Sequence, residues 1–177
     1  MRKLIAILAF GLLMIPALAQ NHTDYNLPQE PVRAPYIDFA SLDQGLWFAF
    51  ELAPTNFFVM DKIALQVDLL AGYRVNEFLR VGAGIAPRLI AGYFSLPIYA
   101  DVRGNIISQE SRMVVPYWSF DVGYSLGKYE RGLYVSPTAG IRIGMPRNNA
   151  LVGLSYTLQG VPGMVFHGIG IKIAYEY

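Results

Sequence analysis

Hydrophobic and polar residues alternate with a period of two along most of the chain. In the segment 165–177 the odd positions are mostly large and apolar, whereas the even positions include Gly168, Gly170, Lys172 and Glu176. Such alternation is typical of a β-strand whose two faces meet different surroundings. The pattern predicts eight strands, near residues 46–52, 63–73, 79–85, 96–103, 114–126, 133–143, 150–158 and 165–177.

The two faces are reversed relative to those of a soluble sheet. No Asp, Glu, Lys or Arg lies on the apolar face of any segment, and the other face is rich in glycine, small residues and single charges. Inside hydrocarbon every backbone amide must be paired within the protein, and a closed barrel does this. Tilted strands of about 9–11 residues are long enough to span. Residues 45–177 are therefore predicted to form an all-β, eight-stranded antiparallel transmembrane β-barrel with up-and-down (meander) order.

The N-terminal residues have the features of an export signal. Arg2 and Lys3 are followed by an apolar run over 4–15 and by the Ala-Leu-Ala sequence at 17–19. This combination predicts a signal peptide over residues 1–19, cleaved before the following Gln. An uncleaved anchor helix is the alternative interpretation. Residues 20–44 contain Pro28, Pro31 and Pro35 and little periodicity, which predicts an extended periplasmic lead-in.

The segments between the predicted strands are short. Tight turns are expected at 74–77 and 145–149. If both ends of the barrel chain face the periplasm, the outer loops fall near 53–62, 88–95, 127–132 and 159–164. Aromatic residues near strand ends would form interface girdles. We expect them at Phe57, Phe58, Tyr93, Phe94 and Tyr129 at one end, and at Tyr73, Phe78, Tyr175 and Tyr177 at the other.

The amino-acid composition excludes several classes of protein. Only 15% of the 177 residues are charged, well under the roughly 25% of an ordinary soluble domain. The net charge of +1 gives no electrostatic basis for a nucleic-acid partner. The chain has no Cys, which excludes a disulfide framework and a thiolate metal site.

Charged residues on the predicted inner face are the candidate functional site. Five acids and five bases would neutralise one another, as buried charges must. We favour a static ion-pair plug because eight strands enclose little space; a gated polar path is the alternative. The carboxylates look like counter-ions rather than acid–base catalysts, since they are spread over several strands beside bases. The predicted network comprises Glu51, Asp68, Arg80, Arg88, Asp101, Arg103, Asp121, Arg142, Lys172 and Glu176.

Neither histidine indicates an enzyme. His22 lies in the lead-in, and His167 has lipid-facing parity at the outer end of the last strand. A lipid-A deacylase, another eight-stranded barrel, would place a Ser beside such a His, but here Gly-Ile-Gly follows His167. Two His without Cys also make a transition-metal site unexpected. We therefore expect no catalytic residues, no metal and no cofactor.

Four stretches carry a resemblance to a known family: PIYADVRGN at 97–105, SFDVGYSLG at 119–127, GLYVSPTAGIRIG at 132–144 and VGLSYTLQG at 152–160. Together with the signal peptide they resemble the small outer-membrane β-barrels common in Bacteroidetes-type bacteria, with OmpA/OmpX-like architecture. The alternation of Ile171, Ile173, Tyr175 and Tyr177 resembles the C-terminal signal read by the barrel-assembly machinery. That family usually ends in Phe, so the final Tyr is a departure.

This resemblance implies architecture rather than activity. The expected function is that of an outer-membrane barrel with a plugged polar lumen and short outer loops, serving as a structural or interaction component of the cell envelope. A narrow pore or transporter for small solutes is the alternative, and a soluble secreted barrel that binds a lipophile is a third hypothesis. Expected partners are outer-membrane lipid and lipopolysaccharide, the barrel-assembly machinery and a further envelope-complex protein, with no nucleic acid.

Overall fold

The structure is a computed structural model that describes residues 44–177 apart from 60, 111, 129 and 146. These belong to the unit 37–177; the other unit, 1–36, lies outside the described residues, as do the predicted signal peptide and nearly all of the lead-in. The strands are β1 Gly45–Phe57, β2 Lys62–Asn76, β3 Leu79–Ile85, β4 Arg88–Ile90, β5 Tyr93–Asn105, β6 Val114–Gly127, β7 Gly132–Met145, β8 Asn148–Val161 and β9 Met164–Glu176.

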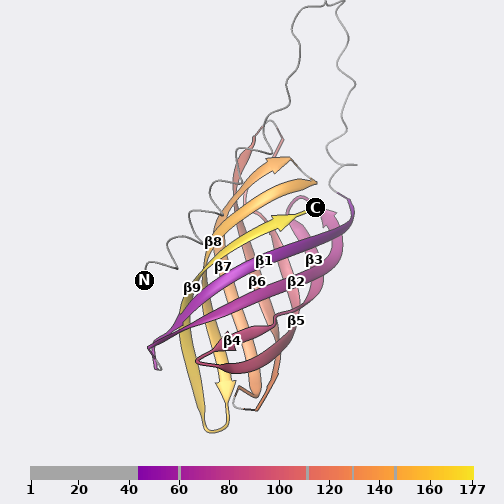
Figure 1. The fold of residues 1–177 in the computed structure, drawn as a ribbon. Helices are drawn as coiled ribbons and strands as arrows, with labels where there is room; N and C mark the ends of the chain where they lie inside the picture. Colours follow the sequence, from indigo (N-terminus) through magenta and orange to yellow (C-terminus); the bar gives the residue numbers. More distant parts are fainter. Residues whose placement is uncertain (1–43, 60, 111, 129, 146) are drawn as a thin grey trace, which may run out of the picture. The chain divides into compact units, whose positions relative to one another are not determined.

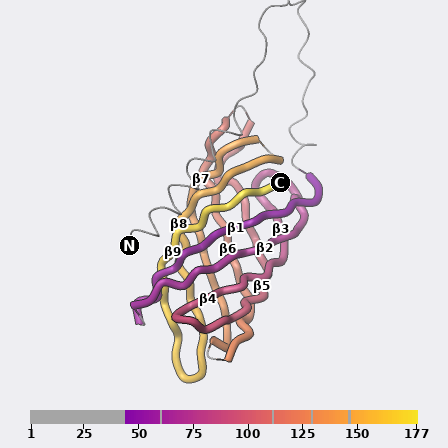
Figure 2. Tube along the Cα trace, viewed as in Figure 1, coloured from indigo at the N-terminus to yellow at the C-terminus, as the bar shows by residue number. Residues whose placement is uncertain are grey.

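All the pairings are antiparallel; apart from β3 and β4, strands that follow one another in the chain pair with each other, and β1 pairs with β9, so the sheet closes on itself (Figure 1). β3 and β4 lie end to end between β2 and β5, and together they form one of eight staves. Figure 2 shows the same meander as a continuous tube. No helix among the described residues is long and apolar enough to cross a membrane.

The stave formed by β3 and β4 is interrupted at Ala86 and Pro87. Pro87 has no N–H to give to the ladder, but its carbonyl accepts from Val67 N at 3.0 Å. The segment 88–95 was expected to be a loop, but most of it belongs to β4 and β5. Only Ala91 and Gly92 connect these two strands. Both have positive φ, 49° and 85°, as a two-residue type I′ hairpin turn requires.

The alternation of the sequence appears directly as two faces. On β9, Ile169, Ile171 and Ile173 face outward and are 42–49% exposed, whereas Lys172 and Glu176 face inward and are at most 2% exposed. One expected girdle residue is misplaced: Phe57 is fully buried and packs inside against β2 and β4. Tyr129, a second expected girdle residue, lies outside the described residues. The other seven are exposed on the outer wall, the face turned away from the barrel interior.

Several strands are longer than the pattern predicted. β2 continues to Asn76, so Arg74 faces the interior instead of lying in a turn. Residues 146–147 alone join β7 to β8, which leaves Asn149 buried in a strand. β8 continues to Val161 in the same way, and Gln159 is buried. Turn-forming residue types thus occur inside strands whose inner face is polar.

Glycines on the inner face lie under large aromatic rings. A Cβ added to Gly84 would lie 2.8 Å from Tyr99 Cζ, and one added to Gly153 would lie 2.8 Å from the Tyr117 hydroxyl. A Cβ added to Gly82 would likewise lie 2.8 Å from Cζ2 of the Trp47 indole. The narrow interior can hold these rings because the adjoining staves carry no side chain there. Aromatic rings and charged side chains therefore lie in the interior.

Candidate functional site

The candidate site is the polar interior of the barrel, which we call the lumen. All ten charged residues predicted for it are at most 2% exposed. Among the described residues the buried charged side chains also include Arg74 and Glu130, which makes six acids and six bases. The two ends of the barrel are named from the chain. The terminal end is where β1 begins and β9 ends, and the hairpin end holds the connections 58–61, 91–92, 128–131 and 162–163.

Two cations form ion pairs with three carboxylates in the middle of the lumen. Arg103 Nε lies 2.7 Å from Asp101 Oδ2, and its Nη1 lies 2.7 Å from Glu51 Oε1. Lys172 Nζ contacts Asp121 Oδ2 at 2.6 Å and Glu51 Oε2 at 3.4 Å. Asp101 and Asp121 are direct cross-strand partners, an arrangement that is unfavourable for like charges. Since each has its own cation, the pair can be tolerated.

The interior aromatic residues take part in the same network. The Arg103 guanidinium lies over the Trp47 ring, 4.8 Å from its centroid, a favourable cation–π geometry. The Tyr99 hydroxyl donates to Asp68 Oδ1 at 3.0 Å, and Gln66 Nε2 donates to the same oxygen at 2.6 Å. Asp68 is thus held by neutral donors where Asp101 and Asp121 have cations.

Glu176 is the centre of an arginine cluster at the terminal end. Its carboxylate forms ion pairs with Arg74 at 3.4 Å, with Arg142 at 3.3 Å and with Arg80. Arg103 Nη1 lies 3.8 Å away and links this cluster to the middle of the lumen. Arg74 was not among the predicted site residues, because residues 74–77 were expected to form a turn and a turn residue is not assigned to either face of the sheet.

Arg88 organises the hairpin end. Its Nε donates to Gln66 Oε1 at 2.8 Å and its Nη1 to Gln159 Oε1 at 3.1 Å. The guanidinium also lies over the rings of Phe57 and Tyr134, at 5.4 and 5.1 Å from their centroids. Side chains from β1, β2, β7 and β8 therefore converge on one cation and fill this end.

A carboxylate from a loop also contacts the residues at the hairpin end. Glu130, in the β6–β7 connection, accepts from Ser95 Oγ at 2.5 Å and forms an ion pair with Arg88 at 3.5 Å. Periodicity could not identify Glu130, because a loop residue has no strand parity. At the terminal end, Gln109 of the β5–β6 connection donates to Gly144 O and Asn149 Oδ1 at 2.8 and 3.0 Å.

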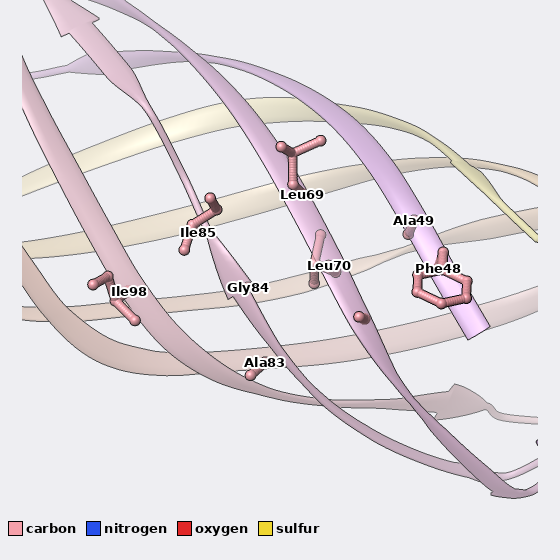
Figure 3. A pocket seen from close by; sticks show the side chains of 9 residues that line it. Phe48, Ala49, Leu69, Leu70, Ala83, Gly84, Ile85 and Ile98 are labelled. Atoms are coloured by element: carbon pink, nitrogen blue, oxygen red, sulfur yellow. The ribbon is translucent and has the colours of Figure 1, made fainter. Parts of the chain in front are cut away.

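The outer wall offers two further candidate features. A pocket of about 470 Å³ lies over Ala71 and Ala83, between larger residues that include Phe48, Leu69 and Ile98 (Figure 3). It is apolar and open, and no charged residue lines it. The residues that line this pocket include no group that could do acid–base or nucleophilic chemistry.

His167 faces outward, as its parity predicted, and lies beside a tyrosine. Its Nδ1 is 2.7 Å from the hydroxyl of Tyr156 on β8, and the two rings are 6.1 Å apart. A Tyr–His pair with amphipathic rings suits a polar–apolar boundary. In the described part of the chain, no group of three or more His, Cys, Asp or Glu could hold a metal ion.

Comparison with known proteins identifies the fold. No protein-family model and no curated protein sequence matches this chain. The crystal structure of Neisserial surface protein A (NspA) is similar over 74% of this chain and 94% of that chain, with a TM-score of 0.58 and 15% sequence identity. The N-terminal β-barrel domain of Pseudomonas aeruginosa OprF is similar over 76% and 99%, with a TM-score of 0.50 and 10% identity. The predicted fold class, an eight-stranded antiparallel β-barrel, is confirmed.

Proposed function

We propose that this protein is an integral outer-membrane β-barrel with a closed lumen, and that it is a structural or interaction component of the cell envelope. The supporting observation is the reversal of its faces. The outer wall carries exposed Leu, Ile, Val and Phe, whereas twelve charged side chains are buried inside. A protein dissolved in water has polar residues outside and apolar residues inside. An apolar outer wall around a charged interior is the arrangement expected in hydrocarbon.

The closed lumen is argued from the packing of its side chains. Arg103, Arg88 and Glu176 each join side chains from three or more strands, and Glu130 and Gln109 lie across the two ends. An eight-stranded barrel is just wide enough to be filled by side chains. A lumen held by paired charges gives the barrel rigidity and no continuous path for solute.

The proposed partners follow from location. The terminal end would face the periplasm and the hairpin end the exterior, where lipopolysaccharide surrounds the wall. Ile171, Ile173, Tyr175 and Tyr177 form an exposed row on the outer wall of β9 and beyond. This row is available to the barrel-assembly machinery during insertion. A cell-envelope protein partner would bind the short connections or the lead-in.

Two measurements on the natural protein test this function. The first is fractionation: we expect the protein in the outer-membrane pellet after alkaline extraction, and its recovery in the soluble fraction would contradict the membrane location. The second is single-channel recording in planar bilayers. A closed lumen gives no conductance steps, whereas reproducible steps would establish the competing function, a narrow pore for small solutes.

Cross-linking in intact cells then addresses the structural role. A reproducible protein adduct would identify an envelope complex, and substitutions in the connections 91–92 and 162–163 should remove it if they form the contact. Recovery with lipid alone would favour a free-standing barrel.

A further inference from the structure

Two polar residues interrupt the apolar outer wall on neighbouring strands. The outward positions of β1 and β9 carry Leu, Ile, Val, Phe, Pro or Tyr, except for Asn56 on β1 and His167 on β9. Both side chains are exposed on the wall. A hydrogen-bonding side chain that faces hydrocarbon is costly unless it has a partner, and such residues often mark functional sites. Two of them at one place therefore indicate a candidate binding surface.

Asn56 and His167 lie beside Tyr156, around one isoleucine. Asn56 on β1 and Tyr156 on β8 are both direct cross-strand partners of Ile169 on β9. His167 is the next outward residue along β9, so it lies diagonal to each of them, at the roughly 7–8 Å that separates diagonal neighbours in a sheet. We call Asn56, Tyr156 and His167 the wall cluster. Its polar groups come from three adjoining strands, and the ladder of the closed sheet fixes their spacing.

The Tyr156–His167 pair has one hydrogen-bond donor that the protein does not use. The neutral imidazole of His167 has one N–H, and Tyr156 has one O–H. The hydrogen bond between them, 2.7 Å from Nδ1 to the hydroxyl oxygen, uses one of these two protons whichever residue donates. Within the described residues neither side chain forms another hydrogen bond, and the carboxamide of Asn56 forms none. These donors are therefore left for a group outside the protein.

The wall cluster lies below the rim of the barrel. His167 is three residues from Met164, where β9 begins, and three residues of a strand tilted by about 45° cover roughly 7 Å of depth. Along the strand, apolar residues flank the ring on both sides: Val165 is 51% exposed and Ile169 is 49% exposed. This depth corresponds to the boundary of the hydrocarbon core, where the acyl linkages of lipids offer carbonyl oxygens as acceptors.

We propose that the wall cluster binds the carbonyl oxygen of a lipid acyl linkage, an ester or an amide, through the unused donor of the Tyr156–His167 pair. Asn56 offers a further N–H beside it, and the acyl chain lies against Ile169 and Ile171. This inference rests on the proposed membrane location. One net hydrogen bond corresponds to about a five-fold preference for a lipid that has the carbonyl over one that lacks it, or about 1 kcal/mol.

Ester- and ether-linked phosphatidylcholines test this proposal, because they can share headgroup and chain length and differ in the carbonyl oxygens. The full-length protein is folded in mixed micelles of both lipids and an uncharged detergent. Native mass spectrometry then measures which lipid remains in the complex that holds a single lipid. The wild type should retain the ester lipid about five-fold over the ether lipid.

Variants that keep the aromatic rings separate hydrogen bonding from packing. The double variant Y156F with H167F has no donor in the pair, and its ester preference should fall to about two-fold or less, the share left to Asn56. Tyr175→Phe is the matched control on the same strand. The Tyr175 hydroxyl already donates to Asn148 Oδ1 at 3.3 Å, so its loss should leave the preference unchanged.

The imidazole nitrogens give a second readout at the site itself. The chain has two histidines, so in protein labelled with ¹⁵N-histidine His22 serves as the internal reference. The signals of His167 should differ between vesicles of the ester lipid and vesicles of the ether lipid, whereas the signals of His22 should not.

Three results would overturn the proposal: equal retention of the two lipids by the wild type, an unchanged preference in the double variant, or identical His167 signals in both lipids, as expected if the pair donates to water. Each variant is first shown to be folded by its heat-dependent mobility on gels. Fractionation of cells reports the membrane location separately, so failure of this proposal is distinct from failure of the proposed function.

Discussion

The contact between Gly84 and the Tyr99 ring can be tested by adding a single methyl group. At Gly84 a new Cβ would lie 2.8 Å from Tyr99 Cζ, 2.9 Å from its hydroxyl oxygen and 3.0 Å from Leu70 Cγ. All three neighbours are side-chain atoms. The distances are shorter than the optimal separation of non-bonded carbon atoms, which is about 3.5–4.0 Å. The ring cannot simply swing away, because its hydroxyl donates to Asp68 and it packs 5.4 Å from the Tyr134 ring.

The expected magnitudes follow from packing. Gly84→Ala should lower the free energy of unfolding by about 1–3 kcal/mol, the usual cost of overpacking. Tyr99→Ala should lower it by about 3–5 kcal/mol, as for loss of any large buried ring. In the Tyr99→Ala background Gly84→Ala should cost under about 0.5 kcal/mol, because the methyl then enters vacated space. The coupling between the two sites, the difference between these two costs of Gly84→Ala, is therefore about 0.5–3 kcal/mol.

Urea unfolding of the protein in lipid vesicles measures all four members of this cycle. The chain has two tryptophans: Trp47 in the lumen and Trp118 on the outer wall. Their fluorescence therefore reports both faces. If Gly84→Ala cost as much without the ring as with it, the strain would come from the backbone or from Leu70, and the steric reason given for the inner-face glycines would be wrong.

Three further predictions concern the wall and the network. Ile171→Arg should cost about 2–4 kcal/mol if it lies near the bilayer midplane, measured by urea unfolding against Ile171→Val; equal stability would mean that β9 has the opposite parity. Arg103→Leu should cost about 3–5 kcal/mol by leaving buried carboxylates unpaired, and high salt should not change this cost if the site is sealed from solvent. Glu130→Ala should lower the free energy of unfolding by about 1–3 kcal/mol, because the buried Arg88 and Ser95 lose a partner, whereas Glu110→Ala, a change in an exposed loop carboxylate, should cost under about 0.5 kcal/mol; equal costs in urea unfolding would mean that the contacts of Glu130 do not stabilise the barrel.

Most of the barrel wall could be predicted, because the face on which a strand residue lies depends only on its position in the alternation along that strand. Alternation along β9 alone assigns Ile171 outward and Lys172 inward, and closure of the sheet follows from the need to pair every amide in hydrocarbon. The same parity predicts that Arg80, Asp101 and Glu176 lie on the inner face. The strand pattern therefore carried the candidate site together with the fold.

What the sequence did not reveal depends on contacts between distant residues. Arg74 lies in a turn-like sequence, but the structure places it inside the lumen, where it pairs with Glu176, 102 residues later. Glu130 belongs to a connection without periodicity, and its inward direction is determined by Arg88 on another stave. Phe57 was assigned to a girdle on its aromatic character, yet it packs under Arg88. Each of these residues lies near the end of a strand. There the direction of a side chain depends on its packing against distant residues rather than on the alternation along the strand.

The arginine cluster around Glu176 has a consequence for folding order. Arg74, Arg80 and Arg142 come from β2, β3 and β7, but their shared carboxylate belongs to the last strand. Until β9 docks on β1, three guanidiniums would stand in a low-dielectric interior without this counter-ion. Contacts of such long sequence separation form late and slowly. A barrel that closes without the final strand would therefore leave these guanidiniums buried without that carboxylate, an electrostatic penalty that would disfavour partly assembled forms.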